Sequence, residues 1–313
     1  MTVTDASLAA LLLTNRIVDV GHKPLSASEF WSLHQAVDDL SSLAGMTVGE
    51  LATTLSITDV EAERFTGLLE ARTAFAFERE RLEEEGVRLI SALDDAFPER
   101  LRARLGGACP AFLLVGGPLP FLQSQALGVV GSRDASPEAL EVAASVAATA
   151  SAHDMAVVSG LARGVDQAAM AAALDGGVAV IGVPSEGIRV AGRDPEVRQR
   201  VHSGQLCVAS PYGPGVRFTA GNAMGRNKLI YALADVTLVV CADSGSGGTW
   251  EGAREALRRG FGRVAVWIGA GAGPGNPQLV DMGGVPVSDI ADLVTVAARA
   301  EPPASERQPT LFE

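Results

Sequence analysis

From residue 126 onward, short apolar runs alternate with longer stretches of helical composition. The runs are apolar throughout, which indicates strands that are buried on both faces of a sheet. Strands are expected at residues 126–130, 156–159, 178–183, 206–209, 236–242 and 264–268. Because helical stretches separate these strands, the pattern predicts an α/β fold with a doubly wound, mostly parallel sheet.

Residues 1–88 show a different pattern, with apolar positions at helical spacing. Capping boxes open three successive segments, formed by the pairs Ser26 and Glu29, Thr47 and Glu50, and Thr58 and Glu61. The pattern predicts a small helical domain of the SAM or helix-hairpin type. The segment 48–70 could also be a helix-turn-helix reader, but its acidic composition favours a bundle that packs or recruits partners.

A bridge joins this region to the large domain, which is expected to span residues 89–290. Its apolar runs, at 86–90 and 110–115, flank a turn that contains Pro98 and predict two short entry strands. Residues 291–313 contain several Pro, Glu and Ser residues and are expected to form a flexible extension.

The charge is unevenly distributed. The chain has a net charge of −12, but residues 1–125 carry 18 Asp and Glu against 10 Lys and Arg, whereas residues 126–283 carry 14 against 13. An acidic chain argues against a broad basic nucleic-acid groove. The balanced central region still permits a local phosphate site, since all of its cations except Lys228 are arginines.

The cysteines and the hydropathy of the chain argue against a disulfide-bonded, zinc-binding or membrane-spanning protein. Cys109, Cys207 and Cys241 lie far apart and show no metal-ligand spacing, so neither a disulfide nor a zinc site is expected. The apolar run 8–13 is too short to span a bilayer and lacks a basic flank. We therefore expect a folded cytoplasmic protein without a metal, a cofactor or a membrane partner.

The loops that follow the strands carry the candidate chemistry, because ligands of open parallel sheets bind at the carboxyl ends of the strands. Glycines allow the backbone to approach a ligand, and hydroxyl, amide and guanidinium groups bind phosphate. The candidate phosphate ligands are Gly131, Ser132, Arg133, Ser159, Gly160, Arg163, Arg226, Asn227, Lys228, Ser244, Gly245, Ser246, Gly247, Gly248 and Thr249. Taken singly, each loop could also be an ordinary strand-to-helix turn or a solvated helix face.

The sequence gives weaker support to general-base catalysis and to nucleoside triphosphate or dinucleotide binding. Asp166 is expected to cap its own turn or orient an arginine, because no second carboxylate lies nearby in the sequence to make it a general base. The glycine-rich loop at 244–249 lacks the lysine of a Walker loop, and no G-x-G-x-x-G fingerprint is present. No catalytic residue is therefore assigned.

The four loops, in this order, resemble the DNA-processing protein A family (DprA, also called Smf). Its G-S-R triplet matches residues 131–133, its S-G-x-A-x-G-I-D loop matches 159–166, its R-N-R-x-I segment matches 226–230, and its S-G-S-x-x-T-A-x-x-A loop matches 244–253. The bridge 95–101 also resembles the family's D-x-x-Y-P-x-x-L. The resemblance implies a Rossmann-like core that binds single-stranded DNA by its phosphates, forms a homodimer, and helps to load the RecA recombinase during uptake of transforming DNA.

The sequence also departs from the family pattern. Ala169 replaces a histidine, Lys228 replaces the second arginine of R-N-R, and Met224-Gly225 replaces a phenylalanine-proline pair. The 244–249 loop is richer in glycine, and the acidic-proline motif is reduced to Ala209-Ser210-Pro211. These departures indicate a divergent member without the C-terminal winged helix.

Two rival hypotheses remain at this stage. In the first, the protein is a sensor or enzyme for a free nucleotide, with Arg133 and Glu251 as its catalytic candidates. In the second, it is a scaffold that acts through its N-terminal helices and its tail. The tail resembles the Q-x-x-L-F peptide that binds the DNA sliding clamp, through Gln308, Leu311 and Phe312. The DNA-binding, non-enzymatic hypothesis is favoured.

Overall fold

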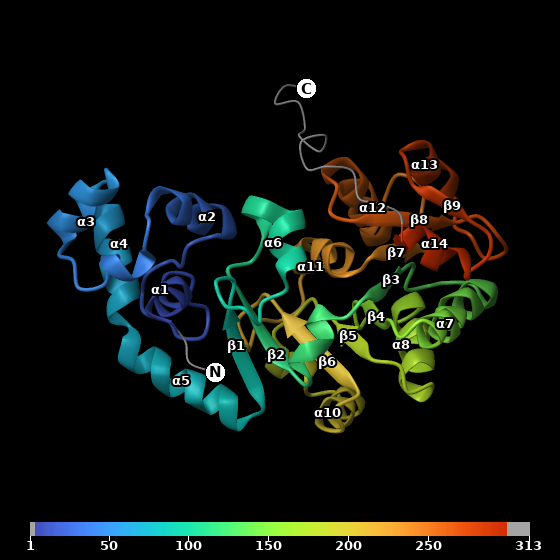
Figure 1. Ribbon diagram of the computed structural model, residues 1–313, viewed down its shortest axis with the longest axis horizontal. Coiled ribbons are helices and arrows are strands. Elements are labelled where there is room, and N and C mark those ends of the chain that lie inside the picture. Colours follow the sequence, from blue (N-terminus) through green and yellow to red (C-terminus); the bar gives the residue numbers. More distant parts are fainter. Residues whose placement is uncertain (1–3, 299–313) are drawn as a thin grey trace.

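Nine strands form one sheet in the computed structural model, which describes residues 4–298 (Figure 1). The spatial order is β1-β2-β6-β5-β4-β3-β7-β8-β9; β1 and β2 are antiparallel to their neighbours and the other strands are parallel. The strands are β1 (Val87–Ser91), β2 (Phe112–Gly116), β3 (Ala126–Val130), β4 (Ala156–Ser159), β5 (Val180–Gly182), β6 (Leu206–Ser210), β7 (Val236–Val239), β8 (Arg263–Trp267) and β9 (Val285–Val287). The predicted doubly wound, mostly parallel α/β fold is confirmed.

The order of the parallel strands reverses at β3. From there, β4, β5 and β6 extend the sheet in one direction, and β7, β8 and β9 extend it in the other. All six strands predicted in the large domain are present, and so are the two entry strands, although β5 and β7 are shorter than expected. β9 was not foreseen, because it is a three-residue edge strand with Pro286 at its centre instead of an apolar run.

The helices of the N-terminal region begin where their capping residues predict. All three capping boxes are formed, at the starts of α2, α3 and α4. The elements of this region are α1 (Asp5–Leu13), α2 (Ala27–Ala36), the 3-10 helix η1 (Leu40–Leu43), α3 (Val48–Leu55), α4 (Asp59–Glu70) and α5 (Arg72–Glu84). Figure 1 shows them beside β1, at one end of the sheet.

The remaining helices connect the strands. They are α6 (Glu99–Leu105), η2 (Gly106–Ala108), η3 (Leu119–Gln123), α7 (Pro137–Ala152), α8 (Val165–Asp175), α9 (Ile188–Ala191), α10 (Pro195–His202), α11 (Ala220–Leu233), α12 (Gly248–Arg259), α13 (Asn276–Asp281) and α14 (Asp292–Ala298). Ser136 caps α7 and Asp194 caps α10, each followed by a proline. None of the helices within residues 4–298 has the length and apolar character needed to cross a bilayer.

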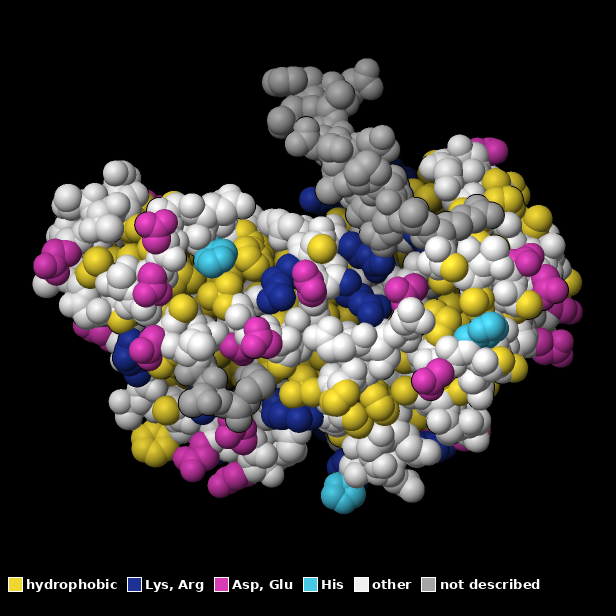
Figure 2. Space-filling view, in the orientation of Figure 1, with side chains coloured by type: hydrophobic (Ala, Val, Ile, Leu, Met, Phe, Trp, Pro, Cys, Tyr) yellow, Lys and Arg dark blue, Asp and Glu magenta, His cyan; other side chains and the backbone are white. Residues whose placement is uncertain are grey.

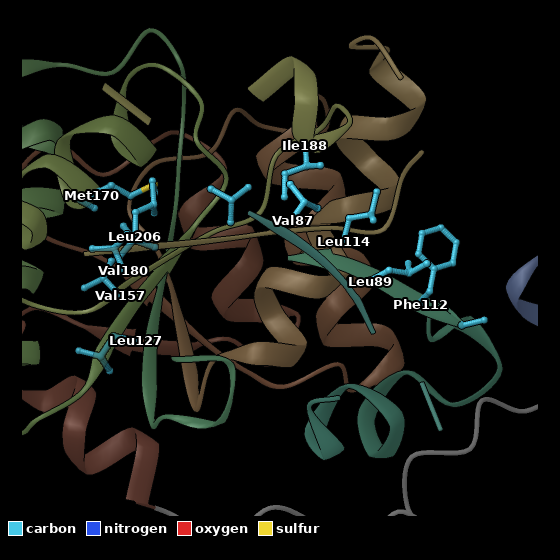
Figure 3. Close-up of a cluster of buried hydrophobic side chains, with 14 of the residues drawn as sticks. Val87, Leu89, Phe112, Leu114, Leu127, Val157, Met170, Val180, Ile188 and Leu206 are labelled. Atoms are coloured by element: carbon cyan, nitrogen blue, oxygen red, sulfur yellow. The ribbon is translucent and has the colours of Figure 1, made fainter. Parts of the chain in front are cut away.

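The sheet separates two layers of core. Alternate residues of neighbouring strands point to one side, where Leu127, Val157, Val180 and Leu206 lie in a row (Figure 3). Side chains of α7 and α8 cover this face, and side chains of α6, α11 and α12 cover the other. Burial on both faces explains why the strands are apolar at every position.

The N-terminal helices share a continuous core with the first of these faces. α5 and α1 pack against β1, and the indole Nε1 of Trp31 donates to the Cys109 carbonyl at 2.7 Å. The predicted boundary at residue 88 falls inside β1, so the division of the chain into helical and sheet parts lies slightly earlier than expected.

The predicted flexible extension does not begin at residue 291. Residues 292–298 form α14, whose Leu293 and Val296 are buried against the sheet. The guanidinium of Arg263 also donates to the carbonyls of Val296 and Ala297, at 2.7 and 2.9 Å. The prediction of a flexible extension is wrong for residues 292–298, because a seven-residue helix with two buried side chains leaves only a weak apolar pattern in the sequence. Gln308, Leu311 and Phe312 lie outside the described residues.

Candidate functional site

A cleft of about 450 Å³ opens where the strand order reverses. The turn after β3, the loop after β7, α11 and the N-terminus of α12 line it. This is the position at which open α/β sheets bind ligands. The topology therefore brings together loops that are far apart in the sequence.

Most of the predicted phosphate ligands line this cleft. They are Gly131, Ser132, Arg133, Arg226, Asn227, Ser246, Gly247, Gly248 and Thr249. The candidates that do not line it are Ser159, Gly160, Arg163, Lys228, Ser244 and Gly245. The first group lines the cleft, and Ser159 and Gly160 of the second group make hydrogen bonds beneath it.

The turn after β3 is held tightly against its neighbours. A Cβ on Gly131 would lie 2.5 Å from Cγ2 of Val165, so only glycine fits there without a shift. The amide of Ser132 donates to the Cys241 carbonyl at 3.1 Å, which ties this turn to the loop after β7. Arg133 is exposed, and its guanidinium lies 5.2 Å from the centre of the Phe218 ring. The turn therefore presents one arginine to the cleft on a fixed backbone.

The loop after β4 builds the floor of the cleft. Ser159 is fully buried and donates to the Val129 carbonyl at 2.7 Å. The amide of Gly160 donates to Asp166 at 3.0 Å, and the Gly160 carbonyl accepts from Arg226 at 2.9 Å. The structural role expected for Asp166 is confirmed, because this carboxylate caps its own loop and lies beside an arginine.

Arg226 carries a charge into the floor of the cleft. It is only 4% exposed, and its Nη2 lies 3.9 Å from Asp166. Burial lowers the pKa of Arg226 and raises the pKa of Asp166, and each charge opposes the shift of the other. In this buried position, each of the two charges therefore depends on the other for its stabilisation.

The N-terminus of α12 faces the same cleft. Gly247, with φ of 91°, precedes the helix, and no side chain caps the first turn. The amides of this turn have no partner within the helix and can bind an anion, which the helix dipole also favours. Asn227 donates to the Gly248 carbonyl at 3.1 Å and so fixes α12 against α11.

The candidates outside the cleft have other partners. The ammonium of Lys228 donates to the Ala108 carbonyl at 2.8 Å, and burial lowers its pKa. Arg163 is exposed and pairs with Asp134 at 3.4 Å. Ser244 donates to Gln278 at 3.1 Å, and Gly245 is exposed in the same loop.

The cleft also contains side chains that sequence reasoning missed. Phe218 and Met224 are about half exposed, and Tyr231 is buried in the floor. Tyr231 follows Asn227 by four residues on α11, a helical spacing that could have suggested a shared face. Phe218 lies in an irregular loop, where the sequence carries no comparable signal.

The charge lining the cleft is mixed. Two arginines are accompanied by four carboxylates, those of Asp134, Asp166, Asp243 and Glu251. Elsewhere, Lys and Arg side chains gather around α6 and α11 in the middle of the face shown in Figure 2. The arginines of α6 donate to main-chain carbonyls; Arg104, for example, donates to the carbonyl of Ala232. The cleft is thus of mixed charge and is not part of a broad basic groove.

Comparison with known proteins identifies the family. The sequence model of the DNA recombination-mediator protein A family matches residues 88–297. The chain belongs to this family. A DprA-type DNA processing protein of Mycobacterium tuberculosis is 33% identical over 250 residues, which cover 75% of this chain and 64% of the relative. The chain therefore spans less than two thirds of that relative's length.

Two solved structures share the fold. DNA processing protein A of Streptococcus pneumoniae has a TM-score of 0.70 at 24% identity, with 94% of this chain and 98% of that one covered. DNA processing protein A of Helicobacter pylori, described as binding single-stranded DNA, has a TM-score of 0.55 at 20% identity. That comparison covers 67% of this chain and 94% of the other. The resemblance read from the four loops is confirmed.

Proposed function

We propose that the protein binds single-stranded DNA by its backbone phosphates in the cleft between the 131–133 turn and the N-terminus of α12. One observation carries the proposal: an uncapped helix N-terminus, Arg133 and Arg226 line a single cleft at the reversal of strand order. Family membership and the single-stranded DNA bound by the Helicobacter pylori relative support it.

The chemistry of the cleft favours binding that tolerates sequence. Its donors include backbone amides, hydroxyls and guanidinium groups, which commonly bind phosphates, and such contacts carry little information about bases. Arg133 lies above the ring of Phe218 at the rim and is the exposed cation of the cleft. Glu251, the other catalytic candidate of the nucleotide-enzyme hypothesis, pairs with Arg254 on its own helix. DNA binding therefore accounts for the cleft better than nucleotide cleavage does.

The family description extends the proposal to partners. A recombination mediator delivers single-stranded DNA to a recombinase, so we infer that a RecA-type recombinase receives the strand from this protein, in the cytoplasm. We also infer that the protein acts as a homodimer, which would place two clefts on one strand and increase its avidity.

Arg133→Ala tests the proposal. Wild-type protein is expected to bind a labelled oligothymidylate, with an affinity that falls as salt rises. The variant should bind about tenfold more weakly at low salt, and the slope of log K against log salt should fall by about 0.7, which corresponds to one lost phosphate contact on a single strand. Fluorescence anisotropy at several salt concentrations measures both quantities.

Two control variants define the site. Arg193→Ala removes an exposed arginine between α9 and α10, and Lys228→Ala removes a cation that binds the Ala108 carbonyl. Both are expected to leave the affinity and the salt slope unchanged. Absence of wild-type binding at low salt would refute the proposal, and an equal loss in Arg193→Ala would move the site out of the cleft.

A further inference from the structure

The floor of the cleft contains two buried donors without partners. Nε of Arg226 and the hydroxyl of Tyr231 make no hydrogen bond, although the two residues are only 4% and 1% exposed. Native proteins pair nearly all buried polar atoms, so an orphaned donor that lines a cleft points to a ligand. Both residues line the same cleft as the N-terminus of α12.

One terminal nitrogen of Arg226 is already engaged. Its Nη2 donates to the Gly160 carbonyl and lies near Asp166, whereas Nε has no partner and is left for a ligand. The charge of the guanidinium is partly balanced by Asp166, but Tyr231 and the first-turn amides of α12 are neutral donors that add no repulsion. Together they supply several hydrogen-bond donors to an oxygen-rich anion in one cleft.

Phosphate chemistry distinguishes two kinds of ligand. A phosphodiester inside a strand has two free oxygens and continues through both of its ester bonds. A phosphomonoester has three free oxygens and a single ester bond, so it can enter a pocket end-on and direct an oxygen to the floor. The cleft, at about 450 Å³, is within the size range of small-ligand pockets, so the phosphate that ends a strand can enter it.

We propose that the cleft contains a phosphomonoester seat, formed by Nε of Arg226, the hydroxyl of Tyr231 and the first-turn amides of α12. Its ligand is the phosphate that ends a DNA strand, and a free mononucleotide carries the same group. The assignment of the ligand as the end of a DNA strand rests on the proposed DNA-binding function. The presence of the seat rests only on the hydrogen-bond donors in the floor of the cleft.

Tyr231→Phe is the appropriate variant. The hydroxyl has no partner in the folded protein, so its removal breaks no internal hydrogen bond, and the ring still fills its place in the core. Thr237→Val is the matched control, because Thr237 also has a buried hydroxyl without a partner but does not line the cleft. Arg226 is less suitable, since its loss would strand the buried Asp166.

A competition experiment tests the seat. The protein is first loaded with an internally labelled oligothymidylate that has no terminal phosphate. Unlabelled oligothymidylates with a 5′-phosphate, a 3′-phosphate or neither then compete for the protein. In a separate measurement, thymidine monophosphate is titrated into the protein by calorimetry. For wild type, at least one phosphorylated end should compete about tenfold better than the unphosphorylated strand, as expected for one further charge-assisted hydrogen bond. Tyr231→Phe should lose this preference, and Thr237→Val should keep it.

The outcomes separate the two proposals. Equal competition by phosphorylated and unphosphorylated strands, with no binding of the mononucleotide, overturns the seat and leaves the DNA-binding function intact. A preference that survives in Tyr231→Phe also overturns it. Binding of the mononucleotide without binding of any oligonucleotide supports the seat, assigns it to free nucleotides, and refutes the DNA-binding function.

Discussion

Replacing Arg226 with methionine is expected to lower the free energy of unfolding by about 3–5 kcal/mol, the usual cost of removing one member of a buried ion pair. Methionine has similar length but leaves the buried Asp166 carboxylate without its cation and the Gly160 carbonyl without its donor. Urea denaturation at pH 7 measures the loss. Arg163→Met, which breaks an exposed pair with Asp134, should cost less than about 1 kcal/mol.

The loss in Arg226→Met should depend on pH. Burial raises the pKa of Asp166, and Arg226 is the strongest influence that opposes this rise. Without Arg226 the pKa rises further, so the folded variant binds a proton at a higher pH than the unfolded chain does. Its stability is therefore recovered as pH falls through the raised pKa and lost as pH rises. Two results would show that the ion pair does not stabilise the floor of the cleft. One is an Arg226→Met variant as stable as wild type at pH 7, and the other is a loss of unfolding free energy that does not become smaller in acid.

Gly164→Ala is expected to disrupt both the fold and DNA binding. Gly164 has φ of 81°, and a Cβ there would lie 2.5 Å from the Ser132 carbonyl oxygen and 2.7 Å from that of Arg133. Backbone atoms cannot yield as a flexible side chain does, so the 131–133 turn must move away from α8. We expect a loss of about 2–4 kcal/mol in unfolding free energy and at least about tenfold in affinity for single-stranded DNA.

Gly177→Ala is the matched control for this substitution. Gly177 has a similar φ of 72°, but a Cβ there meets nothing within 4 Å. It should show only the cost of the left-handed backbone, about 1–2 kcal/mol, with unchanged DNA affinity. Equal losses of affinity in the two variants would mean that strain, and not displacement of the 131–133 turn, causes the effect.

Much of the fold could be predicted because its physical causes are local in the sequence. A strand buried on both faces must be apolar at each position, and the helices between such strands leave few alternatives to a parallel sheet. β9 escaped prediction because a short edge strand needs neither an apolar run nor a regular pattern, and Pro286 argued against it. α14 escaped because two buried side chains in seven residues give a weak signal.

The candidate site could be predicted as a set of loops but not residue by residue. Glycines and hydroxyls at strand ends indicated the 131–133 turn and the start of α12, and both line the cleft. Arg226 and Lys228, in contrast, are separated by about 200° around α11, and only tertiary packing decides which faces the cleft. Arg226 does, whereas Lys228 binds the Ala108 carbonyl.

Hydrogen–deuterium exchange of the first turn of α12 tests the central claim most directly. The amides of Gly248, Thr249 and Trp250 have no helical acceptor, so they should exchange quickly in the free protein. When saturating oligothymidylate is added, bound phosphate is expected to slow exchange in two peptides of the protein. One covers the first turn of α12, and the other covers the 131–133 turn. Protection confined to another surface, such as the groove between α5 and α10, with unchanged exchange at α12, would contradict the account.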